Sequence, residues 1–120
     1  MKKTPHTDAY LQFLGFSRSV AELHGGKLLD ANHTALLDAV ALNWSHGQPL
    51  SVRQAIQQAH LGSPATLHKR LSRLVTNGFL SAQGVEDDRR TKWIKPTDKG
   101  LDYFHSLGMQ MSKALGEEVK

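Results

Sequence analysis

The chain has 120 residues, no cysteine and a formal net charge of +4 at pH 7. This length suits one domain with a modest core, and the lack of cysteine excludes disulfides, thiolate metal sites and cysteine-based oxidant sensing. No apolar run approaches the roughly 20 residues of a membrane-spanning helix, and the amino terminus lacks a signal-peptide core. We therefore expect a cytoplasmic protein with no membrane partner.

The amino-terminal part predicts two helices. Residues 1–5 form a basic arm, and Thr7 or Asp8 can cap a first helix that runs to about His24. The apolar face of this helix comprises Tyr10, Phe13, Leu14 and Val20. Two glycines break it, and a second helix begins near Asp30. The spacing of its apolar residues predicts a buried face made of Leu36, Leu37, Val40, Ala41 and Trp44.

The next segment predicts a helix-turn-helix. Ser51 and Gln54 can form a capping box at the start of a short helix that ends near His60. Gly62 then suits a sharp turn, and Ser63 is a good cap for the following helix. Pro64 fits the first position of that helix.

The helix from Ala65 to Asn77 is amphipathic. Its core stripe is expected to contain Leu67, Leu71, Leu74 and Val75, and its opposite face Ala65, Thr66, Lys69, Arg73 and Thr76, flanked by His68, Arg70 and Ser72. That polar face carries cations and no acid. A solvated face is the plain alternative, but the preceding tight turn favours a recognition helix.

A β-hairpin follows. Two short strands are predicted at 79–81 and 92–95, and the polar loop 84–90 between them is long enough to project as a wing. Pro96 cannot continue the ladder of hydrogen bonds, and Thr97 can cap another helix. The order of helix, turn, helix and hairpin predicts a winged helix.

The last helix is expected over 98–116, with Gly108 near the middle of an apolar stripe. The stripe comprises Leu101, Phe104, Leu107, Met111 and Leu115. A small winged domain has few places to bury it, so pairing with the first helix of a partner subunit is favoured over packing on its own core. Gly108 fits either a bend or a close helix crossing.

The positive charge is concentrated. Residues 51–100 hold nine of the 15 Lys and Arg residues but four of the 11 Asp and Glu residues. Such a basic segment favours partners that carry phosphate, because neutralised phosphates release their counterions.

Other chemistries are poorly supported. The seven histidines include no pair at i, i+4 and no HExxH arrangement, so we expect no metal and no cofactor. A glycine-rich phosphate loop and a nucleophile elbow are absent, and the adjacent Asp87 and Asp88 point opposite ways in an extended loop. We do not expect an enzyme.

Three motifs at characteristic spacing resemble the MarR family of winged-helix transcriptional regulators. They are the leucine-spaced helix that ends in Asn77-Gly78-Phe79-Leu80, the triplet Asp88-Arg89-Arg90, and the segment from Ile94 to Gly100. The resemblance implies an obligate homodimer that binds pseudo-palindromic DNA and often releases it when a small molecule or oxidant arrives. It also implies that Asp88 orients the wing while Arg89 or Arg90 enters the minor groove.

We therefore expect a mainly helical α+β protein, a single winged-helix domain over 1–120. The helix-turn-helix and wing occupy 51–97, and the helices within 1–29 and 98–120 form the dimer interface. The expected function is sequence-specific binding of double-stranded DNA as a homodimeric repressor; the alternative is a winged-helix protein-interaction module. The residues expected at DNA are Ser63, Ala65, Thr66, Lys69, Arg70, Arg73, Thr76, Arg89, Arg90 and Lys92, with Asp88 orienting the wing.

The resemblance also implies an effector pocket between the dimer helices and the DNA-binding lobe. Phe16, Leu23, Trp44 and Tyr103 are the candidates to line it. The same residues suit a hydrophobic core, and the core is the favoured interpretation.

Overall fold

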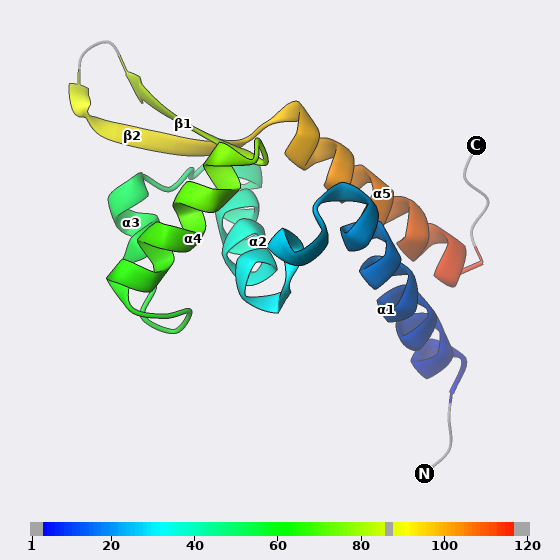
Figure 1. Ribbon diagram of the computed structural model, residues 1–120. Coiled ribbons are helices and arrows are strands. Elements are labelled where there is room, and N and C mark those ends of the chain that lie inside the picture. The colour runs from blue at the N-terminus through cyan, green and yellow to red at the C-terminus, as the bar shows by residue number, and fades with distance from the viewer. Residues whose placement is uncertain (1–3, 86–87, 117–120) are drawn as a thin grey trace.

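The structure is a computed structural model that describes residues 4–85 and 88–116, with the side chains of Lys27 and of residues 85–89 left out. Its elements follow in the order predicted, with a short 3₁₀ helix added after the first helix (Figure 1). They are α1 (Pro5–His24), η1 (Gly26–Leu29), α2 (Ala31–Ser45), α3 (Val52–Ile56), α4 (Pro64–Thr76), β1 (Leu80–Val85), β2 (Asp88–Pro96) and α5 (Asp98–Ala114).

Two regions lie next to each other. We call α2, α3, α4 and the hairpin of β1 and β2 the winged lobe, and α1 with α5 the terminal helices. The terminal helices run side by side and extend away from the lobe, while the hairpin projects from the opposite end (Figure 1). In the described part of the chain, no helix is long and apolar enough to cross a bilayer.

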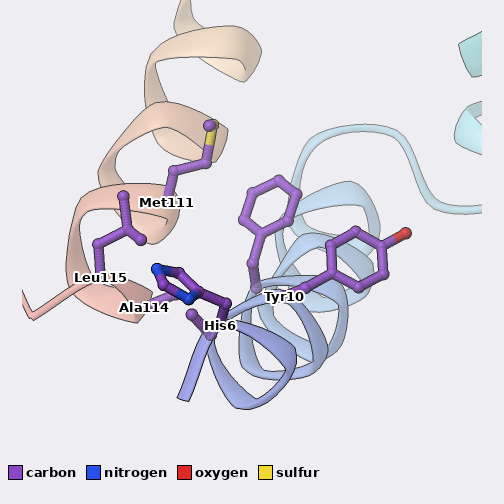
Figure 2. A pocket seen from close by; sticks show the side chains of 7 residues that line it. His6, Tyr10, Met111, Ala114 and Leu115 are labelled. Atoms are coloured by element: carbon purple, nitrogen blue, oxygen red, sulfur yellow. The ribbon is translucent and has the colours of Figure 1, made fainter. Parts of the chain in front are cut away.

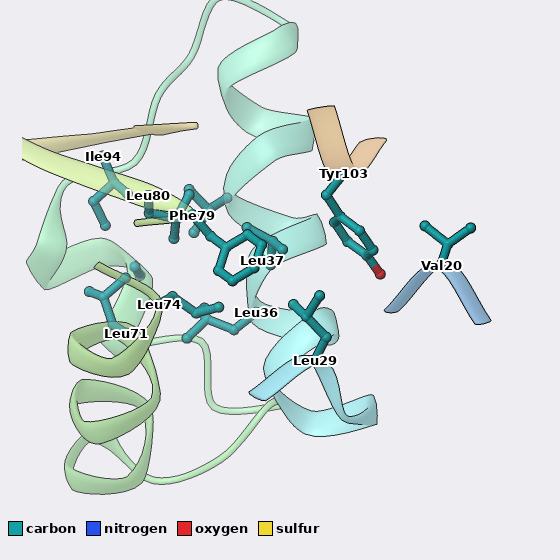
Figure 3. Packing of buried hydrophobic residues seen from close by; sticks show 12 residues of the cluster. Val20, Leu29, Leu36, Leu37, Leu71, Leu74, Phe79, Leu80, Ile94 and Tyr103 are labelled. Atoms are coloured by element: carbon teal, nitrogen blue, oxygen red, sulfur yellow. The ribbon is translucent and has the colours of Figure 1, made fainter. Parts of the chain in front are cut away.

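One hydrophobic cluster joins the two regions. Leu36, Leu37 and Leu74 are completely buried between α2 and α4, with Phe79 and Ile94 from the hairpin side (Figure 3). The terminal helices contribute Val20 and Tyr103, and the Tyr103 ring lies edge-on to the Phe79 ring at 6.2 Å between centroids. Burial raises the pKa of the Tyr103 phenol, and the negative charge of Asp38 adds to the effect.

The strands of the wing pair antiparallel and are longer than predicted. Leu80 lies opposite Pro96 and Gln83 opposite Trp93, and after a register shift Val85 lies opposite Asp88. In the segment expected as a loop over 84–90, residues 84–85 and 88–90 therefore belong to strands, and residues 86–87 lie outside the described part of the chain. Polar residues can form antiparallel strands, because one face of such a sheet can be in water.

Two motifs that carry the family resemblance meet in space at the end of α4. The Thr97 side chain caps α5, and its hydroxyl also donates a hydrogen bond to the Gly78 carbonyl. Lys99 Nζ donates to the Asn77 carbonyl at 2.8 Å and lies 4.6 Å from the centre of the Phe79 ring. Gly78, at φ +85°, makes the turn between helix and strand. This junction holds α4, β1 and α5 together.

Two helix boundaries were predicted wrongly. α1 is capped by Thr4, which accepts the Thr7 N–H at 3.1 Å, because Pro5 suits the first helical position better than Thr7 or Asp8 suits the cap. α3 ends at Ile56 instead of near His60. The Gln58 side chain donates to the Ala55 carbonyl at 3.0 Å and so takes an acceptor that another helical turn would use.

Some residues predicted to be buried are exposed. Trp44 is 37% exposed because the end of α2 extends beyond the core. The stripes of the terminal helices, which were expected to pair with a partner subunit, are open in the single chain: Tyr10 is 62% and Met111 51% exposed. From α5, Tyr103 is buried in the core, and Phe104 and Leu107 pack against it partly buried. The favoured core interpretation thus holds for Tyr103 and is wrong for Phe16, Leu23 and Trp44, which are exposed.

Candidate nucleic-acid interface

The first helix of the helix-turn-helix is held against the wing. Ser51 and Gln54 form the predicted capping box, with bonds of 3.1 and 2.9 Å between each side chain and the other residue's backbone N–H. Just before it, the Ile94 N–H donates to the Leu50 carbonyl at 2.9 Å, and Ser51 forms a β-bridge with Trp93. α3 therefore starts at a set position beside β2.

The turn between α3 and α4 uses one of the predicted DNA-binding arginines. Gly62 has φ +151°, a conformation that other residues rarely adopt. Arg70 Nη1 donates to the Leu61 carbonyl at 3.2 Å, and the side chain is half-buried. Arg70 thus stabilises the turn, and its contact with DNA stays a prediction.

The start of α4 is capped as predicted. Ser63 Oγ accepts the Thr66 N–H at 3.3 Å and donates to Thr66 Oγ1 at 2.9 Å. Pro64 is the first helical residue. Both Ser63 and Thr66 are exposed, so their hydroxyl oxygens stay accessible while they order the first turn.

The rest of α4 separates its two faces as predicted. Leu67, Leu71 and Leu74 are buried, with Val75 partly buried beside them. The opposite face is exposed and comprises Ala65, Thr66, Lys69, Arg73 and Thr76. The sequence of α4 contains no acidic residue, so this face can approach a polyanion without charge repulsion from the helix itself.

The wing supplies further cations. Lys92 is two residues before the buried Ile94 and therefore lies on the same face of the hairpin, beyond the end of the core. Arg90 is exposed on β2. Asp88 and Arg89 belong to β2, but their side chains and the whole of Asp87 lie outside the described residues, so the predicted orienting role of Asp88 stays a prediction.

The structure adds a residue that the sequence analysis missed. A cavity of about 420 Å³ lies between α3 and β2, and Arg53 lines it together with Arg90 and Lys92. The remaining lining residues are Ser51, Val52, Ile56 and Thr91. Nothing in the sequence brings Arg53 near the wing, since the pairing of Leu50 with Ile94 is a tertiary contact.

The terminal helices enclose an apolar groove at their free ends. His6 and Tyr10 of α1 line it together with Met111, Ala114 and Leu115 of α5, and Figure 2 shows the His6 ring facing Met111 and Leu115 while the Tyr10 ring points away from α5. Met111 and Leu115 are 51% and 58% exposed, so the groove is open to water in the single chain. Large exposed apolar areas of this kind mark interaction surfaces more often than isolated exposed residues do.

A second cavity, of about 380 Å³, lies between α1, α2 and α5. Arg18, Asp38 and Tyr103 give it polar groups, and Phe13 and Leu107 are among its apolar walls. Of the four residues predicted for an effector pocket, Tyr103 alone lines this cavity; Phe16, Leu23 and Trp44 do not, because they point to the surface elsewhere.

No group of three or more potential metal ligands occurs within the described ranges. His33 is buried, and its Nδ1 lies 2.9 Å from Asp30 Oδ1. Asp30 caps α2. The pKa of the Asp30 carboxyl is lowered mainly because the carboxylate accepts a hydrogen bond from the His33 backbone N–H.

A helix-turn-helix followed by a two-stranded wing defines a winged-helix protein. No family model matches the chain. Two LexA repressors from Limosilactobacillus reuteri strains are 37% identical to it over 57 residues, which cover 48% of this chain and 26% of theirs. The chain thus spans about a quarter of the length of these curated relatives.

Solved structures match nearly the whole chain. Staphylococcus aureus MarR in complex with salicylate and kanamycin has a TM-score of 0.59 at 18% identity, covering 87% of this chain and 64% of that chain. The Streptomyces coelicolor transcriptional regulator PcaV with its natural ligand has a TM-score of 0.54 at 20% identity, covering 91% of this chain and 72% of that chain. The Streptococcus agalactiae heme sensor PefR in complex with heme has a TM-score of 0.58 at 18% identity, covering 93% of this chain and 76% of that chain. The chain has the winged-helix fold of MarR-type regulators, as its motifs predicted.

Proposed function

We propose that this chain is a homodimeric transcriptional regulator, acting as a repressor, that binds pseudo-palindromic duplex DNA. The observation that carries the proposal is the exposed face of α4, where Lys69 and Arg73 lie among small polar side chains on a helix without acids. In helix-turn-helix proteins the second helix enters the major groove, and Arg and Lys side chains read guanine there. The names of the LexA and MarR neighbours support the same role.

The test begins with a duplex selected from a random-sequence library by the purified protein. We expect Arg73→Ala or Lys69→Ala to weaken binding to this selected duplex by roughly 1–3 kcal/mol, with thermal unfolding nearly unchanged. Lys113→Ala, which removes an exposed cation at the far end of α5, is the matched control and should bind normally. Equal binding by all variants would remove the recognition-helix assignment.

A protein-interaction module is the competing function. Binding of DNA through several phosphates weakens steeply as salt rises, whereas a mainly apolar protein interface does not. A wild-type protein that selects no duplex at low salt would favour the interaction module.

The dimer is proposed from the apolar groove between α1 and α5. Two recognition helices must reach successive major grooves of a palindromic site, which requires two copies of the chain. Met111→Glu places a charge in the groove and should shift the dimer to monomer in sedimentation at micromolar concentration. Gln12→Glu, on the exposed side of α1, should leave the dimer intact. A wild-type monomer under these conditions contradicts the proposal.

We also propose that a small-molecule effector binds in the cavity between α1, α2 and α5. Its Arg18 side chain suits an anionic ligand, and Phe13 and Leu107 suit an apolar ring. Salicylate is a suitable probe: we expect it to weaken binding to the selected duplex, and Arg18→Gln to reduce that effect. Unaltered duplex binding across a salicylate titration would count against this site as a receptor for aromatic acids.

A further inference from the structure

Both tryptophans of the chain line one groove between the end of α2 and the wing. Trp44 lies in the last turn of α2 and Trp93 on β2, and each is 37% exposed. The groove has a volume of about 220 Å³, and its other lining residues are Pro49, Gln83, Gly84, Ile94 and Lys95. Tryptophan is highly buried on average, so two that stay open to water in one place mark this surface as unusual. We call it the tryptophan groove.

Backbone contacts hold the walls of the tryptophan groove. The Gly47 N–H donates to the Trp44 carbonyl at 3.0 Å and turns the chain directly after α2. Trp93 pairs with Gln83 across the hairpin and forms its β-bridge with Ser51 on the other edge of β2. Because both walls are tied in this way, the groove is formed in the single chain before any ligand arrives.

Lys95 gives the tryptophan groove its charge. Trp93 and Lys95 flank the buried Ile94 on β2, so both side chains lie on the face of the hairpin that is turned away from the core. No lining residue is acidic. Asp88 lies at the opposite end of β2, and Asp38 of α2 lines the cavities beside α5 instead. The groove therefore combines two aromatic surfaces with one positive charge.

This combination suits a flat aromatic molecule that carries a carboxylate. Aromatic rings stack on the faces of tryptophan or contact its edges, and the lysine ammonium attracts an anion. The side-chain amide of Gln83 can donate a hydrogen bond to the same carboxylate. Because the volume of about 220 Å³ is smaller than that of sites for drug-sized ligands, the ligand should have one ring or two fused rings.

We propose that the tryptophan groove binds a small aromatic carboxylate, with Trp44 and Trp93 contacting the ring and Lys95 the carboxylate. This is a second ligand site, since it shares no lining residue with the cavity between α1, α2 and α5. It also lies beside the start of α3, because Trp93 is bridged to Ser51, the residue that caps that helix.

The test follows the indole N–H signals of isotope-labelled protein by NMR, because the chain has two tryptophans and therefore two such signals. Trp44→Phe and Trp93→Phe each remove one signal and so assign both. The probe is β-naphthoate, and β-naphthamide is its neutral counterpart of nearly the same shape. We expect β-naphthoate to shift both signals along one saturating curve, with a dissociation constant on the order of 1 mM or below.

Variants of single cations test the contact with the carboxylate. Lys95→Gln should weaken β-naphthoate binding about two- to fivefold, as expected for one exposed ion pair, and should leave β-naphthamide binding unchanged. Lys113→Gln makes the same change in charge at the far end of α5 and should bind both probes as wild type does. Since Lys95 is exposed, thermal unfolding of Lys95→Gln should match wild type.

Arg18→Gln separates the two cavities, because it removes the cation of the cavity between α1, α2 and α5. The tryptophan signals of this variant should respond to β-naphthoate as in wild type. A response that is lost in Arg18→Gln would overturn the tryptophan groove as the site and place the ligand in the other cavity.

The remaining outcomes are equally direct. Tryptophan signals that do not move, or that move without saturating, would overturn the site. Equal affinity of Lys95→Gln and wild type for β-naphthoate would overturn the carboxylate contact. None of these measurements uses DNA, so a failure of the proposed function and a failure of the tryptophan groove are seen separately.

Discussion

The winged lobe and the terminal helices use similar apolar stripes with different results. In the lobe, Leu67 and Leu74 of α4 are completely buried within the same chain. On the terminal helices, Tyr10, Met111 and Leu115 remain more than half exposed, although they follow an equally regular helical spacing. Helical spacing therefore predicts which residues share a face, but the number of elements around a helix decides whether that face is covered.

The largest expected effect tests this comparison with matched leucines. Leu74→Ala leaves a cavity in the lobe and should lower the free energy of unfolding by about 2–5 kcal/mol. Leu23→Ala, on α1 where the side chain is 84% exposed, should change it by less than about 0.5 kcal/mol. Chemical denaturation of both variants measures the difference, and similar losses would show that the two regions are equally packed.

A second prediction compares two glycines on α5. Gly100 lies against the winged lobe, and Gly108 lies farther along the helix, away from the lobe. A Cβ at Gly100 would lie 2.4 Å from the Phe79 carbonyl oxygen, at the junction with the lobe, so Gly100→Ala should destabilise by about 1–3 kcal/mol. At Gly108 a Cβ meets nothing within 4 Å, so Gly108→Ala should stabilise the helix by about 0.5–1 kcal/mol. Opposite shifts in melting temperature are expected. A destabilising Gly108→Ala would indicate that another helix crosses closely there.

The smallest effect concerns Asp30, which caps α2 where the two regions join. Asp30→Ala should cost about 1 kcal/mol at neutral pH. Because the pKa of Asp30 in the folded chain lies below its ordinary value of 3.8, the carboxylate stabilises the fold above that pH, and the benefit is lost as pH falls through the lowered pKa.

Unfolding measured at pH 5 and pH 3 should therefore show a smaller difference between wild type and Asp30→Ala at pH 3. Ser51→Ala removes a cap that does not titrate, so its cost should be nearly the same at both values. If the loss of stability caused by Asp30→Ala grew toward pH 3, the pKa of Asp30 would not be lowered in the folded chain.

Much of this arrangement follows from local sequence. Ser63, Thr97 and the Ser51–Gln54 box cap helices because a side-chain oxygen can reach a backbone N–H three residues away, which depends on nearby residues only. The stripe of α4 and its acid-free opposite face follow from helical spacing in the same way. These features predicted the winged helix and the candidate recognition face.

Other features were decided by tertiary contacts, which a linear reading cannot supply. The bond between Leu50 and Ile94 brings Arg53 beside the wing, and Arg70 binds the carbonyl of the turn residue Leu61. Packing also buries Tyr103 while it leaves Phe16, Leu23 and Trp44 exposed, although all four suited a core. Each depends on segments far apart in the chain that meet when the fold closes. The sequence by itself determined the order of the elements, the caps of α3, α4 and α5 and the polar face of α4. Packing decided which charges line one cavity and which apolar faces stay open, because both depend on what lies opposite in space.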